Sequence, residues 1–155
     1  CWHTEDPYSW AVIPTWAQQT FAEFNGQTNQ QYCWYALAYS KTNDALWNAC
    51  QTNLYRHGEL HNNLRMTWGK QVIPWLTDGP QAQRYLLDLN NRYALDGRDP
   101  SSFGGVLWCL GLFDRPFNPP QKKWGRIRPR TTQQHSNKKS HNQLRLIILI
   151  ANFVC

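Results

Sequence analysis

The chain carries an unusual load of tryptophan. Nine of its 155 residues are Trp, and seven Tyr and six Phe add further large rings. Each such ring buries about 150–250 Å² and needs a packed interior to do so. The composition therefore excludes a disordered or collagen-like chain, and the length predicts a single domain.

Charge is divided unevenly along the sequence. Residues 1–120 hold eight basic and ten acidic side chains, whereas residues 121–155 hold eight basic and no acidic ones. A basic excess is typical of proteins that bind nucleic acid or anionic membranes, but here it belongs to one terminal segment. The body must therefore be interpreted separately from the segment that follows Pro119-Pro120.

Cysteine usage and hydropathy indicate an intracellular protein. The five Cys residues include no Cys-x-x-Cys pair and are too few for a disulfide scaffold, which favours a reducing compartment. The longest apolar run, residues 146–151, is far shorter than the roughly 20 residues that span a bilayer. His57 and His61 lack further ligands for a metal. We expect no membrane and no metal, and a processed or partial chain because it begins with Cys1.

Helix start and stop signals dominate the body, and no segment alternates apolar and polar residues for long. Thr42 or Asn43 is the expected cap of the helix that Gly58 ends, and Asp99 the expected cap before Pro100. Pro74 is expected to bend the end of its helix. The fold class is all-α, with helices expected over residues 14–24, 43–57, 60–76, 80–96 and 101–112, and an apolar run over 32–39.

Spacing alone gives two candidate sites. Arg65, Trp68 and Trp75 share one helix face, where the indoles could relay an electron or, more often for Trp, simply pack in the core. The turn that contains Asp96 and Asp99 carries two carboxylates and a guanidinium, although helix capping explains part of it. Neither pattern decides between structure and function.

Ordered motifs carry a resemblance to a known family. The segments are Asp44–Ala49 (DALWNA), His61–Lys70 (HNNLRMTWGK), Leu89–Pro100 (LNNRYALDGRDP) and Trp108–Phe117 (WCLGLFDRPF). They resemble, in this order, the FAD-binding catalytic domain of class II cyclobutane pyrimidine dimer photolyases. The resemblance runs to about residue 128 and covers less than a third of a photolyase. It implies a helical FAD-binding domain over 1–128 and an atypical irregular basic tail over 129–155.

The resemblance also implies a chemistry and a cofactor. Such enzymes use light-excited reduced FAD to split pyrimidine dimers in ultraviolet-damaged DNA, and the parent protein is expected to be monomeric. By position, Asn90 resembles the asparagine that faces the reactive flavin nitrogen, and Arg65 and Asp96 resemble the ion pair beside the ring. Asp99 is expected close to the same pocket. We expect Arg65 and Asp96 to lie within ion-pair reach.

Two further sets of residues follow from the same resemblance. The indoles through which the family photoreduces its flavin match Trp47, Trp68 and Trp75, and the helix geometry predicts Trp68 in the middle, with the series ending near Asn90. Positions that line the dimer pocket match Asn62, Met66 and Trp108.

The sequence departs from the family in ways that leave other functions open. It lacks the antenna domain and early helices that supply most diphosphate contacts, so the purified chain is expected to bind FAD weakly or not at all and to repair no dimers. Thr67 and Pro74 stand where the family more often has an aromatic and a polar residue. The alternatives are a cryptochrome-like flavin photoreceptor and a non-enzymatic helical module that binds DNA through its basic tail.

Overall fold

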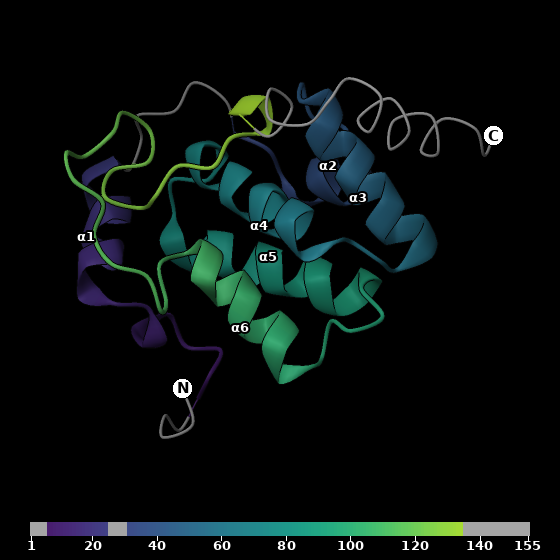
Figure 1. The fold of residues 1–155 in the computed structure, drawn as a ribbon, viewed down its shortest axis with the longest axis horizontal. Coiled ribbons are helices and arrows are strands. Elements are labelled where there is room, and N and C mark those ends of the chain that lie inside the picture. The colour runs from purple at the N-terminus through teal and green to yellow at the C-terminus, as the bar shows by residue number, and fades with distance from the viewer. Residues whose placement is uncertain (1–5, 25–30, 135–155) are drawn as a thin grey trace.

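The computed structural model describes residues 6–24 and 31–134, and helices joined by turns and loops make up this part of the chain (Figure 1). The described segments contain no β-strand, only an isolated bridge between Gln121 and Gly125. The all-α prediction is therefore confirmed. The helices are α1 Thr15–Phe24, α2 Trp34–Ala38, α3 Ala45–His57, α4 Asn62–Gln71, α5 Gly79–Tyr93 and α6 Pro100–Cys109, with short 3-10 helices η1 Trp10–Val12 and η2 Ile73–Trp75.

Local capping explains the bounds of α3. Asp44 is its N-cap and accepts a hydrogen bond from the Trp47 N–H at 2.9 Å. The predicted cap at Thr42 or Asn43 is wrong, because the Thr42 hydroxyl donates to the Asn48 side chain at 2.7 Å instead. The helix ends as predicted at Gly58, whose φ of 70° is the left-handed conformation that glycine adopts without strain.

The long helix expected over 60–76 is divided in the structure. α4 ends at Gln71, and the chain continues as the 3-10 turn η2, in which Pro74 has no N–H to extend an α-helix. The Val72 N–H bonds to the Gly69 carbonyl rather than continuing the α-helical pattern. The direction of the chain therefore changes between Trp68 and Trp75.

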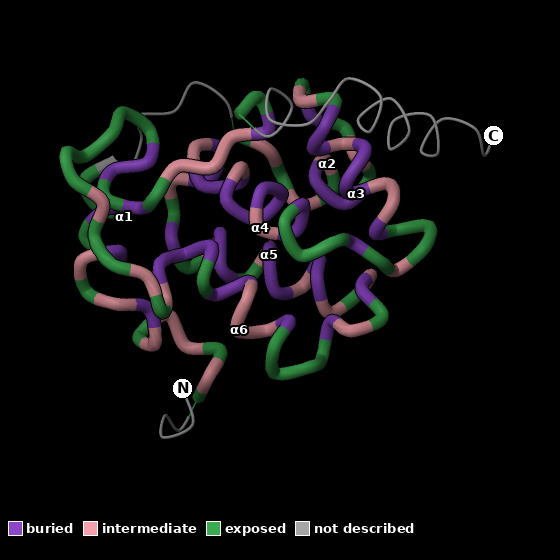
Figure 2. Tube along the Cα trace, viewed as in Figure 1, coloured by how far each residue is buried: buried purple, intermediate pink, exposed green. Residues whose placement is uncertain are grey.

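α4 lies in the middle of the molecule, with α3 on one side and α6 on the other (Figure 1). α6 also packs against α5, and α1 packs against α5. η2 separates α4 from α5 along the chain, and α6 packs against both. Figure 2 shows that the buried stretches concentrate in these inner helices.

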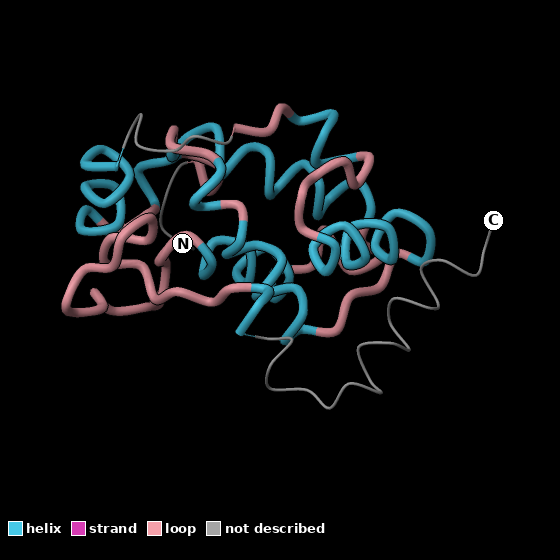
Figure 3. The backbone as a smooth tube through the Cα atoms, turned by 90° about the horizontal axis from the view of Figure 1, so that it is seen from above, coloured by secondary structure: helices cyan, strands magenta, loops and turns pink. Residues whose placement is uncertain are grey.

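The residues after α6 form loops that return to both ends of the body. Seen from above, loops gather beside α1 (Figure 3), where the Arg126 N–H donates to the Thr20 hydroxyl at 3.4 Å. Residues 129–134, which belong to the predicted atypical tail, contact α3 and α4: the Thr132 hydroxyl donates to Asp44 and its N–H donates to Gln71. The rest of that tail, 135–155, lies outside the described residues.

Candidate functional site

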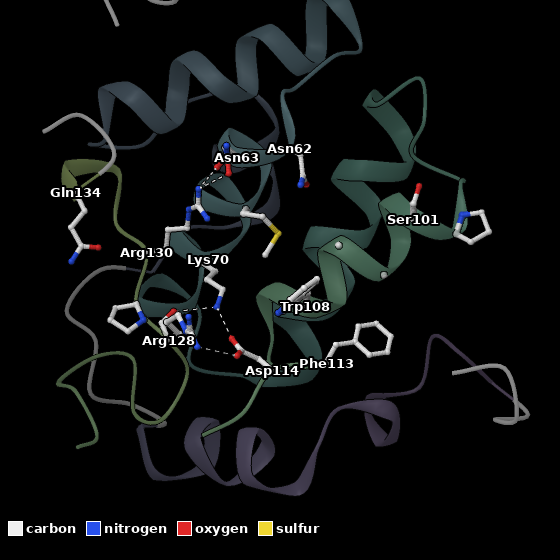
Figure 4. Close-up of a pocket in the computed structure, with 15 residues that line it drawn as sticks. Asn62, Asn63, Lys70, Ser101, Trp108, Phe113, Asp114, Arg128, Arg130 and Gln134 are labelled. Carbon is white, nitrogen blue, oxygen red and sulfur yellow. Dashed lines mark hydrogen bonds and ion pairs between the residues drawn. The ribbon is translucent and has the colours of Figure 1, made fainter. Parts of the chain in front are cut away.

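Two cavities adjoin α4 and α6. The larger has a volume of about 830 Å³ and is enclosed by α4, the start and end of α6, and residues 128–134 (Figure 4). The smaller, of about 280 Å³, lies beside the turn that precedes α6. Asn62, Ser101 and Gly105 line both cavities. The two spaces are therefore neighbours.

The predicted ion pair is present at the wall of the smaller cavity. Arg65 on α4 donates from Nη1 and Nη2 to the two carboxylate oxygens of Asp96, at 2.9 and 2.8 Å. The Arg65 side chain is 10% exposed and that of Asp96 47%, so the guanidinium is buried and the carboxylate faces partly outward. A bidentate arrangement fixes the plane of the guanidinium as well as its position.

Ser102 joins this pair to Asn90. Its hydroxyl oxygen accepts hydrogen bonds from Arg65 Nη1 at 2.6 Å and from Asn90 Nδ2 at 2.9 Å. Asn90 also donates to the Gly97 carbonyl at 3.1 Å, which assigns the amide orientation. The side-chain oxygen Oδ1 of Asn90 and the Nε atom of Arg65 are buried, and neither has a hydrogen-bond partner among the described residues. The cluster therefore retains unused bonding capacity.

The remaining predicted flavin residues are placed differently. Asn90 is fully buried and does not line either cavity, because Ser102 stands at the wall of the smaller one. Asp99 is exposed and also lines neither cavity. It occupies the N-cap position of α6 as predicted, but its side chain makes no capping hydrogen bond.

The three predicted indoles form a contiguous buried series in an order that differs from the prediction. Trp47 stacks on Trp68 with ring centroids 6.1 Å apart and an interplanar angle of 11°, and it meets Trp75 edge-on at 5.5 Å. Trp47 is therefore the middle indole, and the prediction that Trp68 holds this place is wrong. Beyond Trp75, the Tyr32 ring follows at 5.0 Å. The series ending near Asn90 stays a prediction.

A hydrogen bond fixes the middle of the series. The Trp47 indole N–H donates to the Trp68 backbone carbonyl at 2.9 Å, and the Trp68 indole donates to Gln51 at 3.0 Å. The Trp68 carbonyl is available because the turn at the end of α4 directs the Val72 N–H to Gly69. Both indoles therefore have one position and one orientation.

The predicted dimer-pocket residues meet at the larger cavity. Asn62 and Met66 reach it from α4 and Trp108 from α6 (Figure 4). Trp108 is 46% exposed and meets Phe113 edge-on at 6.4 Å, which makes one wall aromatic. The helix-weakening Gly105 also lines this cavity, and a side chain there would meet no heavy atom within 4 Å. The backbone at Gly105 therefore faces the open space of the larger cavity.

A charge cluster around the buried Lys70 forms the opposite side of the larger cavity. The Lys70 ammonium, 4% exposed, lies 3.5 Å from Asp114 and donates to the Arg128 carbonyl at 3.2 Å. The Arg128 guanidinium lies 3.7 Å from the same Asp114. Burial lowers the pKa of Lys70, and the nearby Asp114 only partly offsets this effect. Two cations thus share one carboxylate.

Arg130 continues this side of the cavity. Its Nε donates to the Thr67 hydroxyl at 2.9 Å, and its Nη2 donates to the backbone and side-chain oxygens of Asn63 at 3.0 and 3.2 Å. Thr67 is the position where the resembled family more often has a bulky aromatic. The small hydroxyl therefore leaves space that the guanidinium occupies.

Several residues of the site were not predicted from the sequence. Lys70 could have been predicted from the sequence, because it follows Asn62 and Met66 at four-residue intervals and therefore lies on the same helix face. Ser102 and the cluster around Asp114 had none, since only tertiary packing brings them to the cavities. The described residues include no group of His, Cys, Asp or Glu that could hold a metal ion. None of the described helices is long and apolar enough to cross a membrane.

The fold and the two cavities define a helical domain that holds an ion pair and an amide joined beside the smaller cavity, and a buried series of indoles. No protein-family model matches the chain. It is 36% identical over 128 residues to the deoxyribodipyrimidine photo-lyase of Methanothermobacter thermautotrophicus, which covers 81% of this chain and 28% of that protein. It is 34% identical over 115 residues to the enzyme of that name from Oryza sativa, and 33% identical over 115 residues to that from Potorous tridactylus. These two matches cover 73% of this chain and 22% and 21% of the relatives.

The curated relatives that this chain matches share the name deoxyribodipyrimidine photo-lyase. The chain spans about a quarter of the length of the curated relatives that it matches, from 21% to 28%. The similarity therefore bears on the helical segment whose fold and cavities are described above.

Proposed function

We propose that this chain is part of a class II photolyase, a flavoprotein that uses blue or near-ultraviolet light to split cyclobutane pyrimidine dimers in DNA. The observation that carries the proposal is that Ser102 joins the Arg65–Asp96 ion pair to the Asn90 amide beside the smaller cavity. The stacked indole series includes Trp68, which stands one helical turn from Arg65 on α4. Names of the curated relatives support the same enzyme class. Since the substrate would be genomic DNA, the protein would act inside the cell.

The polar cluster suits the ring system of FAD. Arg65, held by Asp96, would place a fixed positive charge beside a ring that gains electrons. The Asn90 amide lies directly behind Ser102, which lines the smaller cavity, and donates to its hydroxyl oxygen at 2.9 Å. Bound FAD would supply the light-excited electron donor for dimer splitting. The residues present therefore fit the ring, while the diphosphate would need partners that these helices do not provide.

The indoles offer a route for reducing the flavin. Neighbouring rings in the series lie at 5.5 and 6.1 Å between centroids, and Trp68 stands one helical turn from Arg65 on α4. Electrons would pass from Trp75 through Trp47 to Trp68. In a flavin-loaded protein, Trp47→Phe should block photoreduction and leave the absorbance of the bound flavin intact.

The larger cavity suits an extruded pyrimidine dimer. Trp108 offers a face for stacking, and Asn62 offers an amide that can bond to a base edge. Across the cavity, Arg128 and Arg130 offer positive charge for the DNA backbone. An aromatic wall opposite a cationic wall is the arrangement that a flipped nucleotide requires.

A chimaera tests the proposal. The 128 aligned residues of this chain would replace the corresponding segment of the Methanothermobacter relative, and the purified chimaera would be assayed for FAD content and for light-dependent repair of a dimer-containing oligonucleotide. We expect repair under near-ultraviolet light and none in the dark. A folded, FAD-loaded chimaera without repair would contradict a photolyase function and favour a photoreceptor.

The alternative function of DNA binding through the basic tail has a separate test. Salt-dependent binding of undamaged DNA that is lost on removing residues 121–155, with no preference for dimers, would support that reading. DNA binding that depends instead on Trp108 would support the photolyase proposal.

A further inference from the structure

The hydroxyl of Ser102 has one hydrogen-bonding group that is not in use, its hydrogen. It is 4% exposed, and its hydroxyl oxygen accepts from Arg65 Nη1 and Asn90 Nδ2, at 2.6 and 2.9 Å. A serine hydroxyl has two acceptor lone pairs and one hydrogen to donate. Both lone pairs are therefore in use, and the hydroxyl hydrogen is what remains.

No described residue accepts that hydrogen, although Ser102 is buried at the wall of the smaller cavity. The two groups that bond to it are also incompletely paired, at Arg65 Nε and at the Asn90 carbonyl oxygen. Buried donors and acceptors without partners are costly, and because Ser102 and Arg65 both line the smaller cavity, their unused donors indicate a partner that fills this space. The two donated bonds, one of them from a guanidinium, also polarise the hydroxyl and strengthen it as a donor.

We propose that Ser102 is a ligand-binding residue of the smaller cavity and donates its hydroxyl hydrogen to an acceptor atom, a carbonyl oxygen or unprotonated nitrogen, of the flavin ring. Asn90 lies behind it and lines neither cavity. Ser102 is thus the group through which the amide would act on the ring. This inference rests on the proposed function, because it takes the flavin as the ligand.

Titration of the purified 155-residue chain with FAD, followed by quenching of flavin fluorescence, tests the inference. FAD would be raised to millimolar concentration, because the chain supplies few diphosphate contacts. Losing one hydrogen bond to a ring acceptor should weaken binding about three- to tenfold in Ser102→Ala. Ser102→Thr keeps the hydroxyl and should restore the dissociation constant to within about twofold. Ser9→Ala, which removes a serine hydroxyl that lines neither cavity, is the matched control and should bind as the wild-type chain does.

Far-UV circular dichroism and thermal unfolding of each variant separate a loss of binding from a loss of fold. Equal affinity in folded Ser102→Ala and wild type would overturn the inference, as would failure of a folded Ser102→Thr to restore binding. The same variants would also be measured in the chimaera, where equal FAD retention by folded Ser102→Ala and the unsubstituted protein would overturn the inference as well. Repair by the chimaera is measured separately, so the photolyase proposal can hold while the role of Ser102 fails.

Discussion

Replacing Trp47 by Phe should lower the free energy of unfolding by about 3 kcal/mol. The indole is fully buried, and its N–H is the partner of the Trp68 carbonyl at 2.9 Å. The change leaves that carbonyl buried and unpaired, which costs about 1–3 kcal/mol. It also removes buried ring atoms, at about 0.8 kcal/mol for each carbon-sized group, or about 1–2 kcal/mol in all.

Trp34→Phe is the matched control. The Trp34 indole nitrogen is buried but has no hydrogen-bond partner among the described residues, so its removal strands no acceptor. Its ring is only partly buried, and the Arg92 guanidinium 5.2 Å above it can stack on a phenyl ring as well. This variant should lose less than about 1 kcal/mol.

Urea unfolding followed by far-UV circular dichroism measures both losses, and equal slopes against denaturant show that the unfolded states are comparable. A difference of about 2 kcal/mol between the two variants is the expected result. Equal losses would refute the claim that the indole hydrogen bond to the Trp68 carbonyl stabilises the fold.

Three further outcomes follow from the structure. Gly97→Ala should unfold at a clearly lower temperature, at a cost of about 2–4 kcal/mol, because its new methyl group would collide with the backbone oxygen of Asn90 on α5. Gly105→Ala, whose methyl group would meet no heavy atom within 4 Å, should keep the wild-type unfolding temperature. Burial raises the pKa of Cys109 to about 12, so iodoacetamide at pH 8 should modify the exposed Cys33 and spare Cys109 when peptides are mapped by mass spectrometry. Burial lowers the pKa of Lys70 below its unfolded value of 10.5. In the pH window just below 10.5, the unfolded chain therefore still binds the proton that the folded chain has released. The free energy of unfolding of the wild-type chain, relative to that of Lys70→Met, should rise with pH in this window.

Local signals in the sequence predicted most of the helices. Gly58 ends α3 and Asp78 caps α5, and each acts through its own backbone or through atoms a few residues away. The Arg65–Asp96 pair was predicted from the resemblance and is present. Ser102 could not be predicted in this way, because its partners lie 12 and 37 residues away and only the packing of α6 on α4 and α5 brings them together.

The order of the indoles shows why spacing along a helix was insufficient. Trp68 and Trp75 share a face only if one helix continues through both, and on that basis Trp68 becomes the middle ring. The helix ends at Gln71, and the 3-10 turn that contains Pro74 sends Trp75 to Trp47 on α3. The same turn leaves the Trp68 carbonyl for the Trp47 indole, so one change in backbone direction sets both the order of the series and the hydrogen bond at its centre. Trp47 is therefore the position at which a single substitution would interrupt the series and destabilise the fold together, and this is why the unfolding measurement must accompany any test of electron transfer.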